Sequence, residues 1–350
     1  MFRRALLATA LMLALPLAAC GDGAADKKAA GEGGGELNLY TARHYDADQQ
    51  LYRLFEEQTG VRVNRVDGNP DQLIARMRTE GANSPADVFV AADAAALWRA
   101  QEAGLLQPVT SATLTRAIPA NLRDPEGHWF GLARRARIVA YDTARVRPEE
   151  VDTYEEIASP RFRGKLCVRS SDSIYNLSLV GALIEAWGPE KAGEWVRGVV
   201  ANMARPPEGG DRDQIRAVGA GVCEIALTNS YYFIRLASGD DAGDRAITER
   251  VRLAFPSLAG QGAHVNVSGG GVARHAPNRD NAVRFLEFLT TAEAQTIIAT
   301  ANSEFTAANG VANPAPVSNW SDFTAHPMSV TAFGRRQSEA QSLMTAAGWR

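Results

Sequence analysis

The chain lacks the motifs that mark the common enzyme classes. It has no GxSxG nucleophile elbow, no HExxH zinc motif and no Walker phosphate loop. No general base stands beside a plausible nucleophile, so we predict that the protein is not an enzyme. The chain also lacks an excess of either charge, because its formal net charge is -3 with both signs interspersed. It therefore carries no nucleic-acid-binding footprint.

Long hydrophobic runs are absent beyond the N-terminus. Ala5 to Leu15 is apolar but too short for a membrane span, and Arg3 and Arg4 precede it as in a signal peptide. Leu17-Ala18-Ala19-Cys20 resembles a bacterial lipoprotein cleavage box. Residues 1–20 are therefore predicted to be a lipoprotein signal peptide, with Cys20 as the lipidated first residue of a periplasmic, membrane-anchored protein. An ordinary signal peptide with a chance cysteine is the alternative.

Residues 21–36 are Gly, Ala, Asp, Lys and Glu without apolar periodicity. We predict a flexible tether that spans roughly 20 Å root-mean-square. Beyond it the chain has two cysteines, Cys167 and Cys223, each in a strand-like segment. An extracytoplasmic location permits a disulfide between them, and two buried free thiols are the alternative.

Strand and helix patterns alternate through the rest of the chain, which is long enough for two lobes. This order predicts an α/β fold with mostly parallel sheets. Val265 to Val272 is predicted to cross back to the first lobe, and Gly269 to Gly271 within it are predicted to form a bend or hinge. The expected first lobe is 37–136 and 268–310, and the expected second lobe is 137–267 and 311–350.

Tyrosine is scarce, with only 8 residues, yet four follow predicted strands at or near the start of a helix. They are Tyr45, Tyr175, Tyr231 and Tyr232. Ligands of open α/β sheets bind at such strand ends, and the positive end of a helix favours a phenolate. Phenolates suit a hard trivalent cation, so this pattern predicts a ferric iron site. His44 is a further candidate ligand through a neutral imidazole nitrogen, whereas His128, His264 and His275 show no ligand spacing and are predicted to be structural.

Four tyrosinates around Fe³⁺ would leave one net negative charge in a partly dry cleft, which needs compensation. Arg235 follows Tyr231 and Tyr232 by four and three positions, on the same helix face. Arg43 and the Arg134-Arg135 pair also lie near predicted site residues. We expect Arg43, Arg135 and Arg235 to stand behind the ligands rather than to bind the metal.

Several motifs together resemble one protein family. They are Tyr40 to Tyr45, Asn83 to Val88, Leu97 to Ala100, Ser173 to Asn176, Ala204 to Gly209 and Asn229 to Tyr232. The chain resembles the periplasmic ferric-iron-binding proteins of bacterial iron ABC importers, in their cyanobacterial-type branch. The resemblance runs from about Leu37 to the end.

The resemblance implies a two-lobed, type II periplasmic-binding-protein fold related to one transferrin lobe, with iron between the lobes. Its ligand pattern falls on Tyr45, Tyr175, Tyr231 and Tyr232, with His44 beside them. Some relatives add an acidic ligand and a bound anion, but Asp46 is no clear match to that ligand.

The resemblance also implies a monomer that delivers iron to a permease and its ATPase. Ferrous iron is the alternative cargo, and a small oxyanion or another solute is the alternative ligand class.

Overall fold

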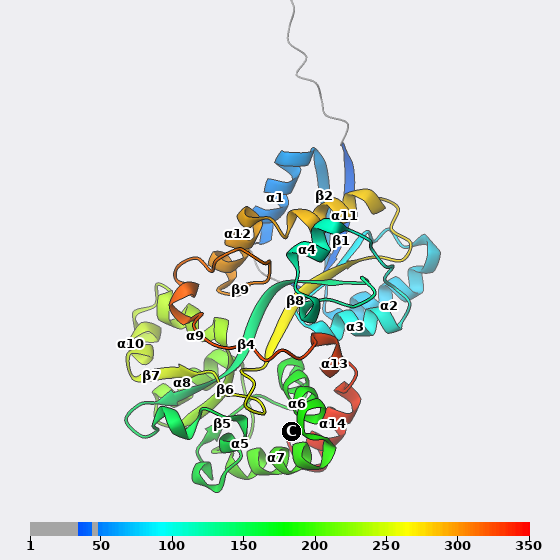
Figure 1. Cartoon of the computed structure of the whole chain (residues 1–350). Helices are drawn as coiled ribbons and strands as arrows, with labels where there is room; N and C mark the ends of the chain where they lie inside the picture. The colour runs from blue at the N-terminus through cyan, green and yellow to red at the C-terminus, as the bar shows by residue number, and fades with distance from the viewer. Residues whose placement is uncertain (1–33, 44–47) are drawn as a thin grey trace, which may run out of the picture.

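The computed structural model describes residues 34–43 and 48–350. Within them, helices surround one mixed sheet with the strand order β2-β1-β3-β8-β4-β6-β5, and β7 and β9 also pair with β4. Figure 1 shows the elements gathered at the two ends of this sheet. We call the end that holds β1, β2 and β3 the first lobe, and the end that holds β5, β6 and β7 the second lobe.

The strands of the described residues are β1 (Gly35–Thr41), β2 (Val61–Asp67), β3 (Val88–Ala91), β4 (Phe130–Asp142), β5 (Leu166–Cys167), β6 (Ile225–Asn229), β7 (Val251–Ala254), β8 (Val265–Val272) and β9 (Phe305–Thr306). The helices are α1 (Asp48–Thr59), α2 (Pro70–Glu80), α3 (Ala94–Glu102), α4 (Ala112–Ala117), α5 (Tyr154–Ile157), α6 (Ile174–Trp187), α7 (Pro189–Asn202), α8 (Asp211–Gly219), α9 (Ser230–Ser238), α10 (Ala242–Arg250), α11 (Arg279–Phe288), α12 (Ala292–Asn302), α13 (Val330–Gly334) and α14 (Gln337–Ala346).

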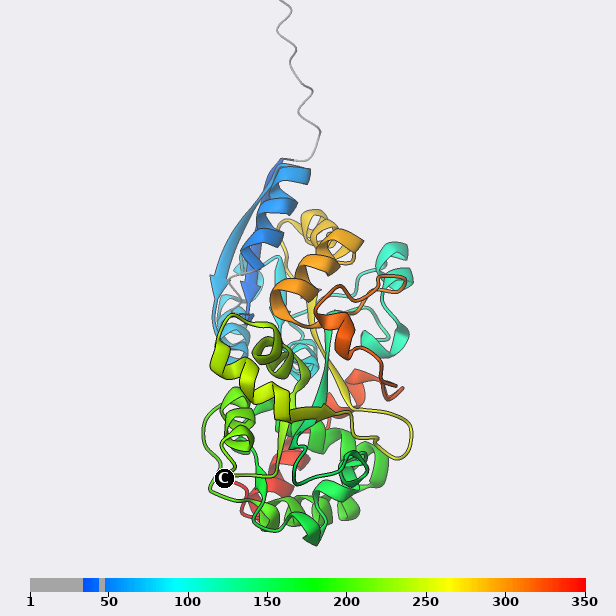
Figure 2. The ribbon, with the colours of Figure 1, turned by 90° about the vertical axis from the view of Figure 1, so that its left-hand side faces the viewer.

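The first lobe is built on parallel βαβ units. β1 pairs in parallel with β2 and with β3, and α1 and α2 supply the crossovers. The start of α2 follows from its sequence, because Asn69 accepts a hydrogen bond from the backbone of Gln72 and Pro70 follows as the first helical residue. Figure 2 shows β1 and β2 at one edge of this lobe, with α1 beside them.

Two long strands, β4 and β8, join the lobes. β4 pairs with β8 as far as Ala136 and with β6 from Arg137 onward, and both pairings are antiparallel. The two-lobed α/β prediction is confirmed, but the prediction of mostly parallel sheets is wrong for this central part. A crossover helix gives parallel neighbours, whereas these strands run to and fro between the lobes and therefore pair antiparallel.

The glycine cluster is part of strand β8 rather than a bend. Gly269 and Gly271 pair with β3. A Cβ at Gly269 would lie 2.5 Å from the carbonyl oxygen of Phe130, and a Cβ at Gly271 would lie 2.3 Å from that of His128. Glycine is needed here because neighbouring backbone approaches too closely for any side chain.

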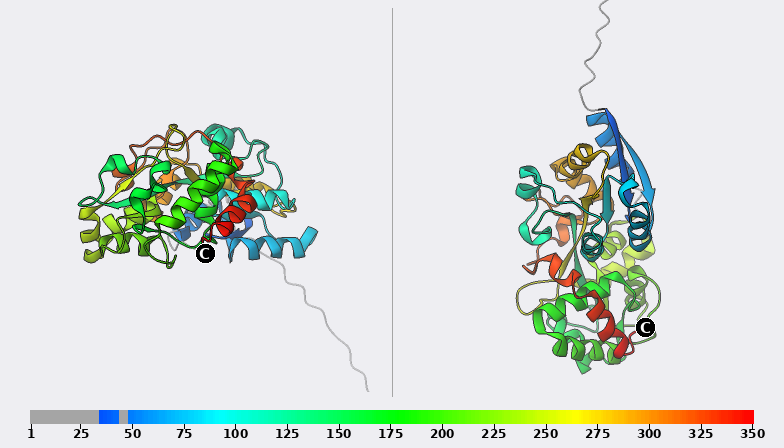
Figure 3. Two further views of the ribbon diagram at one scale, coloured as in Figure 1. Left: turned by 90° about the horizontal axis from the view of Figure 1, so that it is seen from below. Right: turned by 90° about the vertical axis from the view of Figure 1, so that its right-hand side faces the viewer.

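The second lobe carries a disulfide between Cys167 of β5 and Cys223, with a Cα–Cα distance of 5.9 Å. It fastens β5 to the segment that leads into β6. The last helices close this side of the molecule: α14 packs on α6 and α7, and α13 contacts both α6 and α3 of the first lobe, as Figure 3 shows from below and from the side. No helix in the described part of the chain is long and apolar enough to cross a membrane.

Candidate metal centre

Three of the four predicted tyrosines meet in the second lobe. Tyr175 is the second residue of α6, and Tyr231 and Tyr232 are the second and third residues of α9. The hydroxyl of Tyr231 donates a hydrogen bond to the hydroxyl of Tyr175 over 3.1 Å, and the ring centroids of Tyr231 and Tyr232 are 4.1 Å apart. Tyr231 is only 1% exposed. His44 and Tyr45 lie outside the described residues.

The two helices that carry these phenols begin with residues that do not cap them. Ser173 and Asn229 occupy the N-cap positions of α6 and α9, but neither side chain bonds to its own helix. Such residues ordinarily accept a hydrogen bond from the first helical turn. With no side chain capping them, the dipoles of the two helices place positive potential at both helix starts, where the three tyrosines are attached.

A guanidinium faces the ring of each of the three tyrosines. Arg235 lies 5.4 Å from the ring centroid of Tyr231, Arg169 lies 5.5 Å from that of Tyr175, and Arg212 lies 6.0 Å from that of Tyr232. Sequence reasoning found Arg235 but missed Arg169 and Arg212. The available signal was position, because Arg169 follows β5 and Arg212 lies in the first turn of α8, where α/β folds gather ligand-binding groups.

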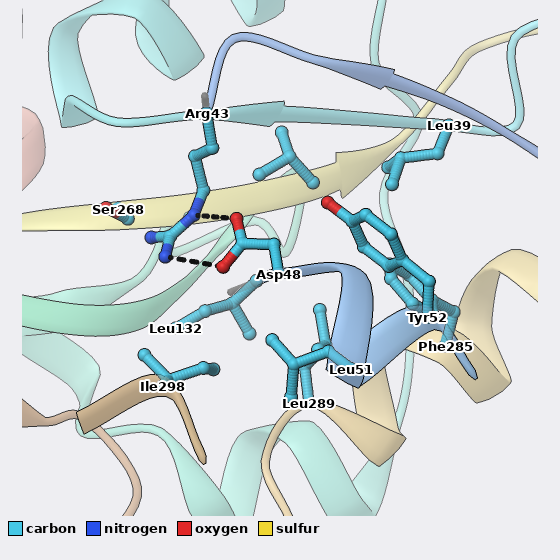
Figure 4. Close-up of a pocket in the computed structure, with 12 residues that line it drawn as sticks. Leu39, Arg43, Asp48, Leu51, Tyr52, Leu132, Ser268, Phe285, Leu289 and Ile298 are labelled. Atoms are coloured by element: carbon cyan, nitrogen blue, oxygen red, sulfur yellow. Dashed lines mark hydrogen bonds and ion pairs between the residues drawn. The ribbon is translucent and has the colours of Figure 1, made fainter. Parts of the chain in front are cut away.

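Two buried residues flank the predicted first-lobe ligands. Arg43 follows β1 and is 6% exposed, and Asp48 begins α1 and is 2% exposed. Their side chains form a two-pronged ion pair, with Arg43 Nε 3.0 Å from Asp48 Oδ2 and Nη2 3.4 Å from Oδ1. Figure 4 shows this pair at a cavity of about 20 Å³ in the first lobe. The pair joins the last described residue before 44–47 to the first one after them.

A buried carboxylate, Glu304, links this pair to the central strand. Glu304 is fully buried and lies 3.2 Å from Arg43 Nη1 and 3.2 Å from Arg135 Nε. Arg135 also donates to Ser268 Oγ and to the carbonyl of Ala92. The preceding residue, Arg134, instead donates to the carbonyl of Thr306. Of the two arginines, Arg135 is therefore the one that joins the network of Arg43, Asp48 and Glu304.

The network carries balanced charge and reaches the tyrosines. Arg43 and Arg135 face the carboxylates of Asp48 and Glu304, so these two arginines alone bring no net positive charge to the site. Asn302 then bridges the lobes: its Nδ2 donates to Asp48 over 3.0 Å, and its carbonyl accepts from Arg235 over 2.9 Å. Sequence reasoning missed Asn302 and Glu304, because their partners are far away along the chain.

A small polar cavity of about 10 Å³ adjoins Tyr175, and it is lined by Arg135, Arg137, Tyr175, Asn229, His264 and Asn266. This volume suits about one water molecule. Burial, and then the neighbouring Arg137 guanidinium, lowers the pKa of His264 to about 3 from an ordinary value of 6.5. The imidazole is therefore neutral here, and His264, predicted to be structural, lies against the tyrosine site.

The donor set separates this site from the usual divalent-metal centres. No group of three or more His, Cys, Asp and Glu side chains that could hold a metal ion occurs within residues 34–43 and 48–350. The converging groups are phenols backed by guanidiniums, which favours a highly charged cation or an anionic complex of one.

A family model described as bacterial extracellular solute-binding protein matches residues 50–325. The chain belongs to this family. It is a solute-binding protein and not an enzyme, and the fold is that of the periplasmic binding proteins.

Comparison with individual proteins shows which members of the solute-binding family this chain resembles. Iron uptake protein A1 of Synechocystis is 44% identical over 315 residues, which cover 90% of this chain and 88% of the relative. The structure of the Trichodesmium protein called IdiA or FutA, in complex with iron and citrate, is 47% identical with a TM-score of 0.87 and covers 90% of this chain and 100% of that one. The ferric binding protein of Campylobacter jejuni is 36% identical with a TM-score of 0.84, over 90% of this chain and 100% of that one. The resemblance to the ferric-binding proteins of iron ABC uptake, in their cyanobacterial-type branch, is thus confirmed for this solute-binding protein.

Proposed function

We propose that the protein captures ferric iron through tyrosinates and delivers it to an iron ABC importer. The observation that carries this proposal is the 3.1 Å approach of the Tyr231 and Tyr175 hydroxyls, with Tyr232 stacked on Tyr231. Similar proteins are named as iron uptake and ferric binding proteins, which agrees with iron as the cargo.

The chemistry follows from replacing a proton with a metal. The hydroxyl of Tyr231 donates its proton to that of Tyr175, which carries a proton of its own. A trivalent cation that displaces both protons gains two anionic ligands. Free phenol ionises only near pH 10, but the charge of the bound ion dominates the local acidity. Binding therefore releases protons, and we expect the apparent affinity to fall as the pH falls.

The first lobe supplies the remaining ligands in this proposal. Tyr45, with His44 beside it, lies in the sequence between Arg43 and Asp48, whose side chains form an ion pair. Iron bound first by Tyr175, Tyr231 and Tyr232 would then be covered from the first lobe, across the Asn302–Arg235 bond. A closed state gains stability from the metal only through these added ligands.

Delivery requires a membrane location and two lobes that separate. We propose that Cys20 carries the lipid anchor and that residues 21–34 let the protein reach the permease. The predicted tether of residues 21–36 is two residues too long, because Gly35 and Glu36 pair with β2 as the start of β1. The lobe division at residues 136 and 137 is also a proposal, and it falls where β4 changes its pairing partner from β8 to β6. The permease would release the iron by parting the lobes.

A titration of the metal-stripped protein with ferric citrate tests this function. The readout is the visible absorbance of phenolate-to-iron charge transfer, at neutral pH. We expect one coloured, saturating complex per chain. A colourless protein that gains no thermal stability from ferric citrate would remove ferric iron as the cargo, and the same titration with ferrous iron and then with oxyanions would follow.

A further inference from the structure

Arg137 is a buried arginine that lies between the elements that carry the three tyrosines. It is 2% exposed and stands in β4 directly opposite Asn229 of β6. We propose that Arg137 is a positioning residue for the metal site, which sets the relative placement of Tyr175 and the Tyr231–Tyr232 pair. This inference rests on the proposed function.

One arm of the guanidinium holds the start of α6. Nη2 of Arg137 donates to Asn176 Oδ1 over 2.7 Å, and Asn176 directly follows Tyr175. The amide group of Asn176 is in turn fixed, because its Nδ2 donates to the carbonyls of Arg169 and Ser170 over 3.1 and 3.0 Å. The backbone that carries Tyr175 is thus tied to β4 by a chain of short bonds.

The other arm holds the starts of α8 and α9. Nη1 of Arg137 lies 3.1 Å from Asp211 Oδ1 and 3.2 Å from Asn229 Oδ1. Asp211 is the first residue of α8, and Asn229 is the N-cap residue of α9, two positions before Tyr231. The carboxylate of Asp211 balances the buried charge of Arg137, so the brace adds no net charge to the site.

The side chain of Asn229 does not cap its own helix, which distinguishes this arrangement from ordinary packing. An asparagine at an N-cap position stabilises its own helix by accepting from the first turn. Asn229 instead turns its oxygen to Arg137, so α9 gives up a cap while its start is fixed against α6. The planar fork of an arginine reaches three acceptors at fixed angles, which a lysine ammonium does not reproduce.

Single-arm variants test the brace in the full chain with ferric citrate as the probe. Asn176→Ala should weaken ferric binding about tenfold through Tyr175, and Asn229→Ala should weaken it similarly through Tyr231 and Tyr232. In a Tyr175→Phe background the first substitution should have no further effect, whereas the second should keep its full effect. Both should also shift the charge-transfer band. Arg137→Lys should combine both losses.

A matched control separates positioning from general stability. Asn202 makes a comparable buried brace elsewhere in the second lobe, from its Nδ2 to the carbonyls of Ile157 and Ser159, both over 2.8 Å. Asn202→Ala should lower the melting temperature but leave the ferric affinity and the band unchanged.

The inference is overturned if the arm variants bind as the wild type does, or if Asn176→Ala weakens binding equally with and without the Tyr175 hydroxyl. If Arg137→Lys does not fold, the arm variants decide alone. A colourless wild-type protein would instead overturn the ferric function itself, so the two failures are distinguishable.

Discussion

The two halves of the proposed metal site rest on different kinds of interaction. In the second lobe, Tyr175 and Tyr231 stand on helix starts that are braced through neutral asparagine side chains on Arg137. In the first lobe, an ionic chain runs from Asp48 through Arg43 and Glu304 to Arg135. The second-lobe half therefore relies on neutral amides gathered on one buried ion pair, Arg137–Asp211, whereas the first-lobe half relies on a chain of charged side chains. Loss of one charge should disturb the first-lobe half more than loss of one hydrogen bond disturbs the second.

Removing the phenol oxygens of the second lobe should produce the largest loss of binding. Tyr231→Phe with Tyr232→Phe keeps both rings, whose centroids are 4.1 Å apart, so the fold should persist. Ferric affinity should fall by about a thousandfold, near 4.1 kcal/mol, and the visible colour should disappear. Titration with ferric citrate and a thermal melt measure the two effects. Tyr141→Phe in β4 is the control, and a coloured, tight-binding double variant would exclude these phenols as ligands.

Sequence patterns located this half of the site because its signals are local. The phenols follow strand-like runs and open helices, and β8 has the bounds that its pattern predicts, Val265–Val272. In the first lobe, sequence patterns identified Arg43 and Arg135 but missed the carboxylate that joins them, because Glu304 is distant in sequence from both. Glu304 lies 261 positions from Arg43 and 169 from Arg135. A single carboxylate between two arginines leaves no periodic trace in the chain.

The opposing pairing of β4 and β8 was hidden for a related reason. A strand's apolar pattern predicts that it is buried but does not say which neighbour it pairs with. The glycines of β8 suggested a bend because the backbone atoms that exclude a Cβ at Gly271 belong to His128, far away in the chain.

Removing the central charge of the first-lobe half should cost stability as well as affinity. Glu304→Gln keeps the shape of the side chain but removes the negative charge that lies 3.2 Å from Arg43 and 3.2 Å from Arg135. Breaking a buried ion pair from one side typically costs about 3–5 kcal/mol, measurable by urea unfolding. Glu185→Gln is the control, because its partner Arg336 is exposed and an exposed ion pair contributes little to stability. Equal, small effects of both substitutions would contradict the buried-charge account.

The neutral histidine between the halves should make stability depend on pH. The pKa of His264 is about 3 in the folded protein against 6.5 ordinarily, so the unfolded chain binds the extra proton between these values. Stability should therefore be lost as the pH falls from about 6.5 toward 3, by up to about 1.4 kcal/mol per pH unit from this group. His264→Gln should flatten that part of the profile in urea unfolding at a series of pH values. An unchanged slope in the variant would assign the acid sensitivity to other groups.

Removing the guanidiniums over the tyrosine rings should weaken ferric binding less than the substitutions above. The half-buried Arg235 should matter more than the exposed Arg212. Arg235 lies 5.4 Å from the Tyr231 ring and also bonds across to Asn302, whereas Arg212 is exposed and lies 6.0 Å from the Tyr232 ring. A cation over a ring is worth about 0.5–1 kcal/mol when exposed and about 2 when desolvated. Arg235→Ala should therefore weaken ferric binding by about tenfold and change the preference for ferric over ferrous iron. Arg212→Ala should weaken ferric binding by less than about threefold, and this effect should disappear at high salt. Equal losses for both variants would mean that net charge, rather than contact with a particular phenol, sets the affinity.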